Sequence, residues 1–222
     1  MGLFSVFSLK KSPLVIQNIL SPAKKNIYLT FDDGPDPETT NEVLDLLKAE
    51  KWNATFFVIG HLAEKNLNLI QRMLNEGHSV MSHSVDHDYS HYFNGKEHLK
   101  TWLQNSLKNL SFITKQPQKV FRPPAGILTP PLLEAATELN IPLILWNHRF
   151  YDAVWGLSEK KLLKSVPKLK EGDIVLLHDR QSAKKRPIFL SALKTYIRTM
   201  KAQDFIGTSL SEDVIFQQLG GS

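Results

Sequence analysis

The stretch Thr30-Phe31-Asp32-Asp33-Gly34-Pro35 decides the fold of this chain. It follows the apolar run Ile27-Tyr28-Leu29, so a short buried strand ends in two adjacent carboxylates and a Gly-Pro turn. Functional sites of βα-repeat folds are built at this end of the sheet. Because side chains alternate faces along a strand, the two carboxylates can take different tasks, one as a metal ligand and one as a base. A turn with a helix cap is the competing interpretation, since Asp-Gly-Pro is favourable turn chemistry.

Strand-like and helix-like segments alternate from this stretch to the end of the chain. Strands are predicted at 27–31, 55–59, 79–82, 120–121, 143–146, 174–177 and 205–209. Apolar residues show helical spacing at 99–110 and 190–200, and Asp36-Pro37-Glu38 and Pro130-Pro131 are typical helix starts. This order predicts an α/β fold with mostly parallel strands, as a distorted (β/α)7-type barrel. An open doubly wound sheet is the alternative.

Length and composition favour one domain. It is predicted at residues 27–215, between an N-terminal extension at 1–26 and a C-terminal tail at 216–222. The apolar share of 42% supports a sizeable core, and no apolar run approaches the ~18 residues of a membrane helix. Cysteine is absent, so any metal site must use His, Asp or Glu. The net charge of +5 suits acidic polymers, but no nucleic-acid-binding motif accompanies the lysine clusters.

A pair of histidines follows another predicted strand, in Ser82-His83-Ser84-Val85-Asp86-His87. On a helical turn, a spacing of four residues points both imidazoles the same way. With one Asp they form a set typical of a hydrolytic Zn²⁺ or Co²⁺ site that keeps positions open for water. The remaining histidines are interpreted as structural or surface groups: His61, His78, His91, His98 and His148.

Two further strand ends carry polar groups. In Phe121-Arg122-Pro123-Pro124-Ala125-Gly126, a stiff turn aims a guanidinium that suits bidentate pairing with a carboxylate. The run Ile174-Val175-Leu176-Leu177 is a buried-strand pattern that ends in His178-Asp179. The alternative for the first stretch is a surface turn with a solvated Arg. The second stretch, taken alone, is equally well explained as a capped strand end. Because four separate strand ends bear Asp, His or Arg, we favour a functional site.

With these motifs the chain resembles the polysaccharide deacetylase family, the NodB-homology domain of carbohydrate esterase family 4. The matching motifs are TFDDGP at 30–35, H-S/T-x-x-H at 83–87, R-x-P-x-G at 122–126 and Leu-x-His at 176–178. The strand at 55–60 is also characteristic of the family, and the resemblance extends from about residue 27 to about residue 212.

The resemblance implies a divided catalytic unit. Asp33, His83 and His87 would hold one divalent metal, with zinc expected first and cobalt or manganese as alternatives. Asp32 would be the general base for the attacking water, and Arg122 would pair with Asp32 and tune it.

The other side of the reaction is implied to depend on a second set of residues. His178 would protonate the leaving amine, and Asp152 would orient His178 and support its charge. The backbone N–H of Ala125 would help to hold the oxyanion, and Leu176 would line the pocket for the acetyl methyl group. The substrate-binding residues expected in total are Ala125, Leu176, Pro124 and Trp155.

The chain departs from the family pattern at three positions. Ala125 stands where the family usually has Tyr, so a sugar-contacting side chain is lost. The D-x-x-D-W motif has Arg149 at its first acid and Ala153 at its Trp, and Trp155 is expected to replace the missing ring in part. These changes concern substrate specificity more than catalysis.

The resemblance implies an enzyme that hydrolyses the N-acetyl group of N-acetylglucosamine-containing glycans. Peptidoglycan is expected first and chitin-type oligosaccharides second. The alternatives are an O-acetyl esterase acting on xylan-type substrates and a catalytically silent glycan-binding relative. The expected partner is a glycan, with no nucleic acid, no integral membrane segment and a monomeric chain. Family members work mostly on envelope or extracellular glycans, whereas residues 1–11 lack the order of a secretory signal.

Overall fold

The computed structural model describes residues 9–20 and 25–220, apart from the side chains of Val154 and Trp155. Its centre is a parallel sheet with the strand order β4-β3-β2-β7-β6. Two short strands, β1 (Val15–Ile16) and β5 (Leu143–Ile144), pair in parallel, and β8 (Ile206–Gly207) pairs with the first residues of β2. The strands of the main sheet are β2 (Asn26–Asp32), β3 (Thr55–Val58), β4 (Ser79–Ser82), β6 (His148–Arg149) and β7 (Ile174–His178).

Strand pairing continues past both edges of this sheet and curves it into a distorted barrel. Parallel bridges join Ser82 to Phe121 and Phe121 to Leu143. Residues 143–149 form one run that begins beside Phe121 and ends in β6, which pairs with β7. The pairings therefore pass around a ring. The prediction of an α/β fold with mostly parallel strands in a barrel-type arrangement is confirmed.

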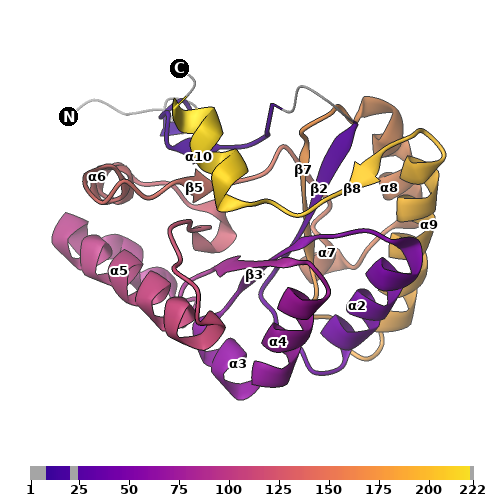
Figure 1. Cartoon of the computed structure of the whole chain (residues 1–222), viewed down its shortest axis with the longest axis horizontal. Helices are drawn as coiled ribbons and strands as arrows, with labels where there is room; N and C mark the ends of the chain where they lie inside the picture. The colour runs from indigo at the N-terminus through magenta and orange to yellow at the C-terminus, as the bar shows by residue number, and fades with distance from the viewer. Residues whose placement is uncertain (1–8, 21–24, 221–222) are drawn as a thin grey trace.

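Helices cover the outside of the barrel (Figure 1). In that view α2 (Thr39–Glu50), α8 (Glu159–Ser165) and α9 (Arg186–Lys201) lie on one side, and α5 (Gly95–Thr114) and α6 (Pro130–Glu138) lie on the other. Among the described residues, no helix has the length and apolar character needed to cross a bilayer. The other helical segments are α3 (Gly60–Lys65), α4 (Leu67–Asn75), η1 (Tyr89–Phe93), η2 (Pro124–Gly126), α7 (Asp152–Trp155), η3 (Val166–Lys168) and α10 (Glu212–Gly220).

The predicted helix starts are confirmed by their capping hydrogen bonds. The Asp36 carboxylate accepts from the backbone N–H of Thr39 at 2.8 Å, where α2 begins. The Thr129 hydroxyl accepts from the N–H of Leu132 at 3.2 Å, and Pro130 and Pro131 occupy the first turn of α6. Side-chain acceptors and proline at these positions satisfy or remove N–H groups that have no partner inside the helix.

Alternation along the strands separates the core from the site. In β2, Ile27, Leu29 and Phe31 belong to the large apolar cluster between the sheet and the helices. Tyr28 belongs to a second cluster inside the barrel. Asp32 has the same parity as Tyr28, so its side chain faces the interior at the carboxyl end of the strand. The sheet register sets Asp32 directly beside His178 of β7.

The opposite end of the barrel is closed by the two ends of the chain. Ile16 of β1 and Ile19, three residues later, are buried in the inner cluster with Leu210 and Ile215. Phe216 of α10 packs against the same cluster. The described parts of the segments assigned by the sequence to an extension and a tail therefore contribute to the core.

Candidate active site

The two adjacent carboxylates diverge at the end of β2, as alternation requires. Asp32 is the last residue of the strand and is buried. Asp33 has a φ of +70°, in the left-handed region that few residues other than glycine adopt, and this turns its side chain toward the loop after β4. Gly34 follows against the buried carboxylate of Asp179, where an added Cβ would lie 2.4 Å from Asp179 Oδ1. This close approach requires glycine in the turn.

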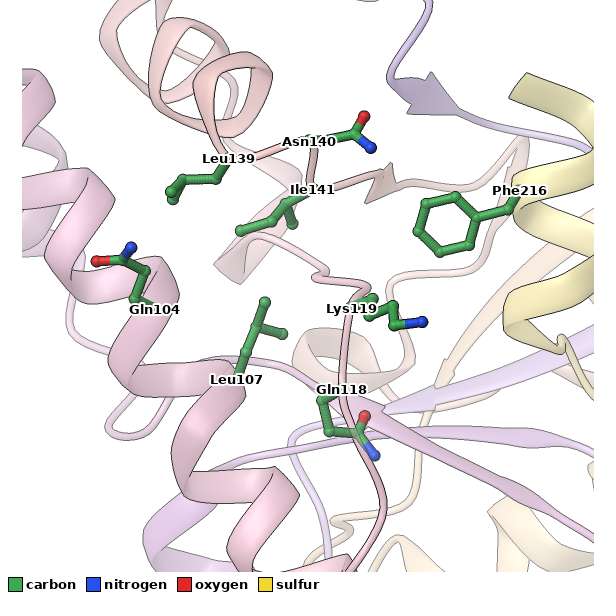
Figure 2. A pocket seen from close by; sticks show the side chains of 8 residues that line it. All are labelled: Gln104, Leu107, Gln118, Lys119, Leu139, Asn140, Ile141 and Phe216. Atoms are coloured by element: carbon green, nitrogen blue, oxygen red, sulfur yellow. The ribbon is translucent and has the colours of Figure 1, made fainter. Parts of the chain in front are cut away.

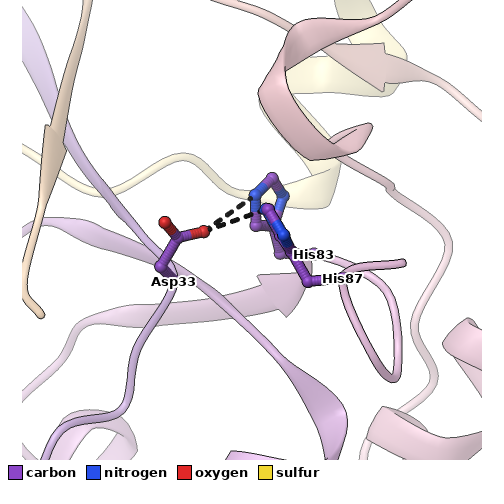
Figure 3. Close-up of side chains that lie close together, drawn as sticks. All are labelled: Asp33, His83 and His87. Carbon is purple, nitrogen blue, oxygen red and sulfur yellow. Dashed lines mark ion pairs between the residues drawn. The ribbon is translucent and has the colours of Figure 1, made fainter. Parts of the chain in front are cut away.

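Asp33, His83 and His87 converge on one point (Figure 3). Their ligand atoms lie within 4.8 Å of one another, with Asp33 Oδ1 at 3.4 Å from His83 Nε2 and 3.2 Å from His87 Nε2. Asp33 Oδ1 is buried and accepts no well-formed hydrogen bond from the described residues. Burial alone would raise the pKa of Asp33, but the two imidazoles hold it well below its usual range. Two imidazole nitrogens and a buried carboxylate oxygen without a hydrogen-bond partner form a set of ligand atoms that suits a divalent cation.

The two histidines are oriented from behind. His83 Nδ1 lies 2.8 Å from the backbone carbonyl of Arg122, which leaves Nε2 pointing at Asp33. The N–H of His87 donates to the Ser84 hydroxyl at 2.8 Å, and His87 has a φ of +58°. A contact to the other ring nitrogen, as at His83, fixes the ring orientation of a metal-ligating histidine, whereas the Ser84 bond holds the backbone of His87.

Asp32 is held by a fully buried arginine. Arg122 Nη1 donates to Asp32 Oδ1 at 2.7 Å and to the Thr30 hydroxyl at 2.7 Å. Its other N–H groups donate to the backbone carbonyls of Ile144 and Leu145, and its guanidinium lies 3.7 Å from the centre of the Phe57 ring. Burial lowers the pKa of Arg122, and the charge of Asp32 opposes that shift. Arg122 therefore pairs with a carboxylate as the stiff proline turn suggests, but through Nη1 alone and not in the expected bidentate geometry, because Nε and Nη2 donate to backbone carbonyls.

His178 faces Asp32 from the neighbouring strand and is held by Asp152. His178 Nδ1 lies 2.9 Å from Asp152 Oδ1, and the backbone N–H of His178 donates to Asp152 Oδ2 at 2.8 Å. Burial lowers the pKa of His178, but the hydrogen bond and charge of Asp152 outweigh it and raise the pKa to about 9. An imidazole with this environment is protonated at neutral pH and can donate its Nε2 proton.

The two carboxylates of the β2 end, the His pair and His178 line one cavity of about 240 Å³, whereas Arg122 and Asp152 hold their partners from outside it. Of the substrate-binding residues expected from the sequence, Ala125 and Leu176 line it, whereas Pro124 is buried behind it and accepts from the Tyr92 hydroxyl. Trp155 belongs to α7, and its side chain lies outside the described part of the structure. The full lining is Asp32, Asp33, His83, His87, Tyr89, Ala125, Trp146, Arg149, Tyr151, Ala153, Leu176 and His178.

Three aromatic side chains of this lining were not singled out in the sequence. Tyr89 comes two residues after the His pair, and its ring lies edge-on to His87 at 5.2 Å. Trp146 lies in the run that closes the barrel, and an added Cβ at Gly126 would touch its ring. Tyr151 enters the pocket lining after a left-handed turn, with φ of +57°. None of them carries a local pattern that distinguishes it from a core aromatic residue.

A larger cavity, of about 510 Å³, lies away from this chemistry (Figure 2). It is bordered by α5, the segment before Phe121 and Phe216 of α10. Among the described residues that line it, Lys119 is the one ionisable side chain, so size alone does not identify the site.

The other histidines make hydrogen bonds away from the Asp33 group. His78 accepts from the N–H of Ala54, and burial lowers its pKa to about 4. His148 pairs with Asp173 at 2.9 Å. His61 lies 2.8 Å from the carbonyl of Val85, and His91 contacts both Asp86 and His98.

Comparisons with known proteins find similar sequences and a similar fold among deacetylases. The family model described as polysaccharide deacetylase matches residues 20–144. A peptidoglycan-N-acetylglucosamine deacetylase of Bacillus cereus is 34% identical over 191 residues, covering 85% of this chain and 88% of that protein. The peptidoglycan-N-acetylmuramic acid deacetylase PdaA of Bacillus subtilis is 31% identical over 204 residues, covering 88% and 73%. A crystal structure of a peptidoglycan N-acetylglucosamine deacetylase superposes with a TM-score of 0.81 at 26% identity, covering 93% of this chain and 95% of that one.

Proposed function

Because this chain belongs to the polysaccharide deacetylase family, we propose that it is a metal-dependent hydrolase that removes N-acetyl groups from N-acetylglucosamine-containing glycans. Peptidoglycan is the first substrate expected and chitin-type oligosaccharides are the second. One observation carries the proposal: a carboxylate held by a buried arginine and a histidine held by a carboxylate line the same pocket as the Asp33-His83-His87 group. All of these groups come from one chain, so we expect a monomer to be active.

Asp33, His83 and His87 are proposed to hold one divalent cation, with zinc expected first and cobalt or manganese as alternatives. The fit is supported by the buried, unsatisfied Oδ1 of Asp33 and by a donor set of two imidazoles and one carboxylate. When bound, such a cation supplies Lewis acidity and lowers the pKa of water.

Asp32 is proposed to take the proton of the attacking water. Arg122 holds one of its oxygens, so the other, Oδ2, is free to act as the base on the side of His83, whose Nε2 lies 3.7 Å from it. The water oxygen forms a bond to the acetyl carbon as its proton passes to Asp32.

His178 is proposed to complete the reaction from the other side of the pocket. As the bond between the acetyl carbon and the sugar nitrogen breaks, His178 gives its Nε2 proton to that nitrogen, because an amine leaves poorly as its anion. Acetate and a free amine are the products. Leu176, two residues before His178 on the same face of β7, is proposed to contact the acetyl methyl group, and Ala125 to donate its backbone N–H.

The proposed function is tested by acetate release from three substrates: peptidoglycan, chitooligosaccharides and acetylated xylan. The metal-loaded protein is expected to release acetate from peptidoglycan at the highest rate. Release from xylan alone would indicate an O-acetyl esterase, and glycan binding without acetate release would indicate a silent relative.

Replacing Asp152 with Asn is expected to move the alkaline limb of the kcat profile. In the wild type the proton of His178 is lost as pH rises through its pKa of about 9. Without the Asp152 charge, burial lowers that pKa toward or below its ordinary value. The midpoint of the alkaline limb should therefore move to lower pH by more than about one unit. Asp173→Asn alters the His148–Asp173 pair outside the pocket and should leave the limb in place. An unmoved limb in Asp152→Asn would contradict the role of His178 as the acid.

A further inference from the structure

Arg149 lies on the same face of the barrel as the reacting groups. The register of β6 and β7 pairs Arg149 with Leu176, and paired residues of neighbouring strands project from the same face. Leu176 and His178 are two residues apart in β7 and also share that face. The guanidinium of Arg149 therefore borders the pocket into which His178 points.

The guanidinium is held in place without being neutralised. It lies 4.1 Å from the centre of the Tyr151 ring, and its Nη2 donates to the Tyr151 hydroxyl. Within the described ranges, no carboxylate lies within 4.0 Å of Arg149, whereas Arg72, Arg186 and Arg198 each pair with one. An arginine that is oriented by stacking and keeps open N–H donors is suited to bind a carboxylate.

Two of the described residues that border the pocket are alanines. Ala125 and Ala153 line the cavity with no atom beyond Cβ, and Ala153 is exposed. An anionic group of a bound sugar can therefore approach Arg149 at the rim without meeting a large side chain from either alanine.

We infer that Arg149, positioned by Tyr151, is a specificity-determining residue that binds a carboxylate on the sugar substrate. The enzyme then favours an N-acetylhexosamine whose carboxylate substituent lies near the reacting acetamido group, over a neutral one. This inference rests on the proposed function, because it assigns the class of glycan that the same pocket accepts.

The test compares two forms of one substrate. Peptidoglycan strands freed of their peptides carry a lactyl carboxylate on alternate sugars, and coupling to methylamine converts these carboxylates to neutral amides without altering the acetamido groups. The Arg149→Gln variant should lose about tenfold in kcat/KM on the acidic strands, the loss typical of one charge-assisted hydrogen bond, and less than about twofold on the amidated strands. Arg149→Lys keeps the positive charge but lacks the planar guanidinium. Its kcat/KM on the acidic strands should therefore lie between those of the wild type and Arg149→Gln.

Matched controls separate this effect from net charge and from misfolding. Lys194→Gln removes one positive charge from the exposed face of α9. It should not change the ratio of kcat/KM on the acidic strands to kcat/KM on the amidated strands. Equal losses of Arg149→Gln on both strands, or no loss on either, would overturn the inference while leaving the proposed function in place. If the wild type released no acetate from either strand or from chitooligosaccharides, the proposed function would be overturned together with the inference.

Discussion

Asp32→Asn is expected to abolish acetate release while leaving the cation bound. A positioned general base contributes about 10²–10⁴-fold to rate, so kcat should fall by about 10³-fold. The amide oxygen of Asn can still accept from Arg122 Nη1, and Asp33, His83 and His87 are untouched, so the metal content should stay at that of the wild type. The measurement is acetate release together with metal analysis of the same preparation.

The stability of this variant must be measured beside its activity. Arg122 is wholly buried, and loss of its counter-charge costs about 3 kcal/mol when a buried ion pair is broken. The assay temperature is therefore set well below the unfolding midpoint of Asp32→Asn. Asp88→Asn is the matched control, because it neutralises an exposed carboxylate one residue after His87 and should keep kcat within about twofold. Wild-type activity in folded Asp32→Asn would contradict the assignment of the base.

His83→Ala is expected to remove both the cation and the activity. Its imidazole contributes one of the three ligand atoms and is held by the Arg122 carbonyl, and alanine offers no ligand atom in its place. Changes to the outer contacts of a metal site typically cost 10–100-fold in affinity, and loss of a ligand should cost more than about 100-fold. Metal analysis and a competition titration with a chelator measure the loss, and acetate release should fall to background.

The control for this prediction is another histidine of the same chain. His98 is exposed on α5 and contacts His91, outside the Asp33 group. His98→Ala should therefore bind the metal with the affinity of the wild type. If His83→Ala retained stoichiometric metal at wild-type affinity, the proposed ligand set would be wrong.

The fold could be predicted largely because its strands carry strong local signals. The apolar run at the start of β2 and the apolar run of β7 are both visible in the sequence. By contrast, β1 and β6 are two residues long and exist because neighbouring strands supply their hydrogen-bond partners. No periodicity can reveal such strands. α10 was likewise missed, since its burial against the inner cluster depends on the tertiary structure.

The candidate site could be anticipated as a set of residue types but not as an arrangement. Side chains at strand ends meet at one edge of a parallel sheet, which is why Asp32, His83, Arg122 and His178 could be grouped before their distances were known. The groups that orient these side chains could not be predicted, because backbone carbonyls such as those of Ile144 and Leu145 have no signature in the sequence. The stacking of Arg149 on Tyr151 depends on a left-handed turn at Tyr151, which its residue type does not favour.

The most direct test of the central claim is the stoichiometry of the products. Wild-type protein, loaded with zinc, is incubated with peptidoglycan, and acetate and newly formed primary amines are counted in parallel with and without a chelator. An N-deacetylase with this site should yield one amine for each acetate, and chelation should stop both. Acetate without new amine, or equal yields in the presence of the chelator, would contradict the account.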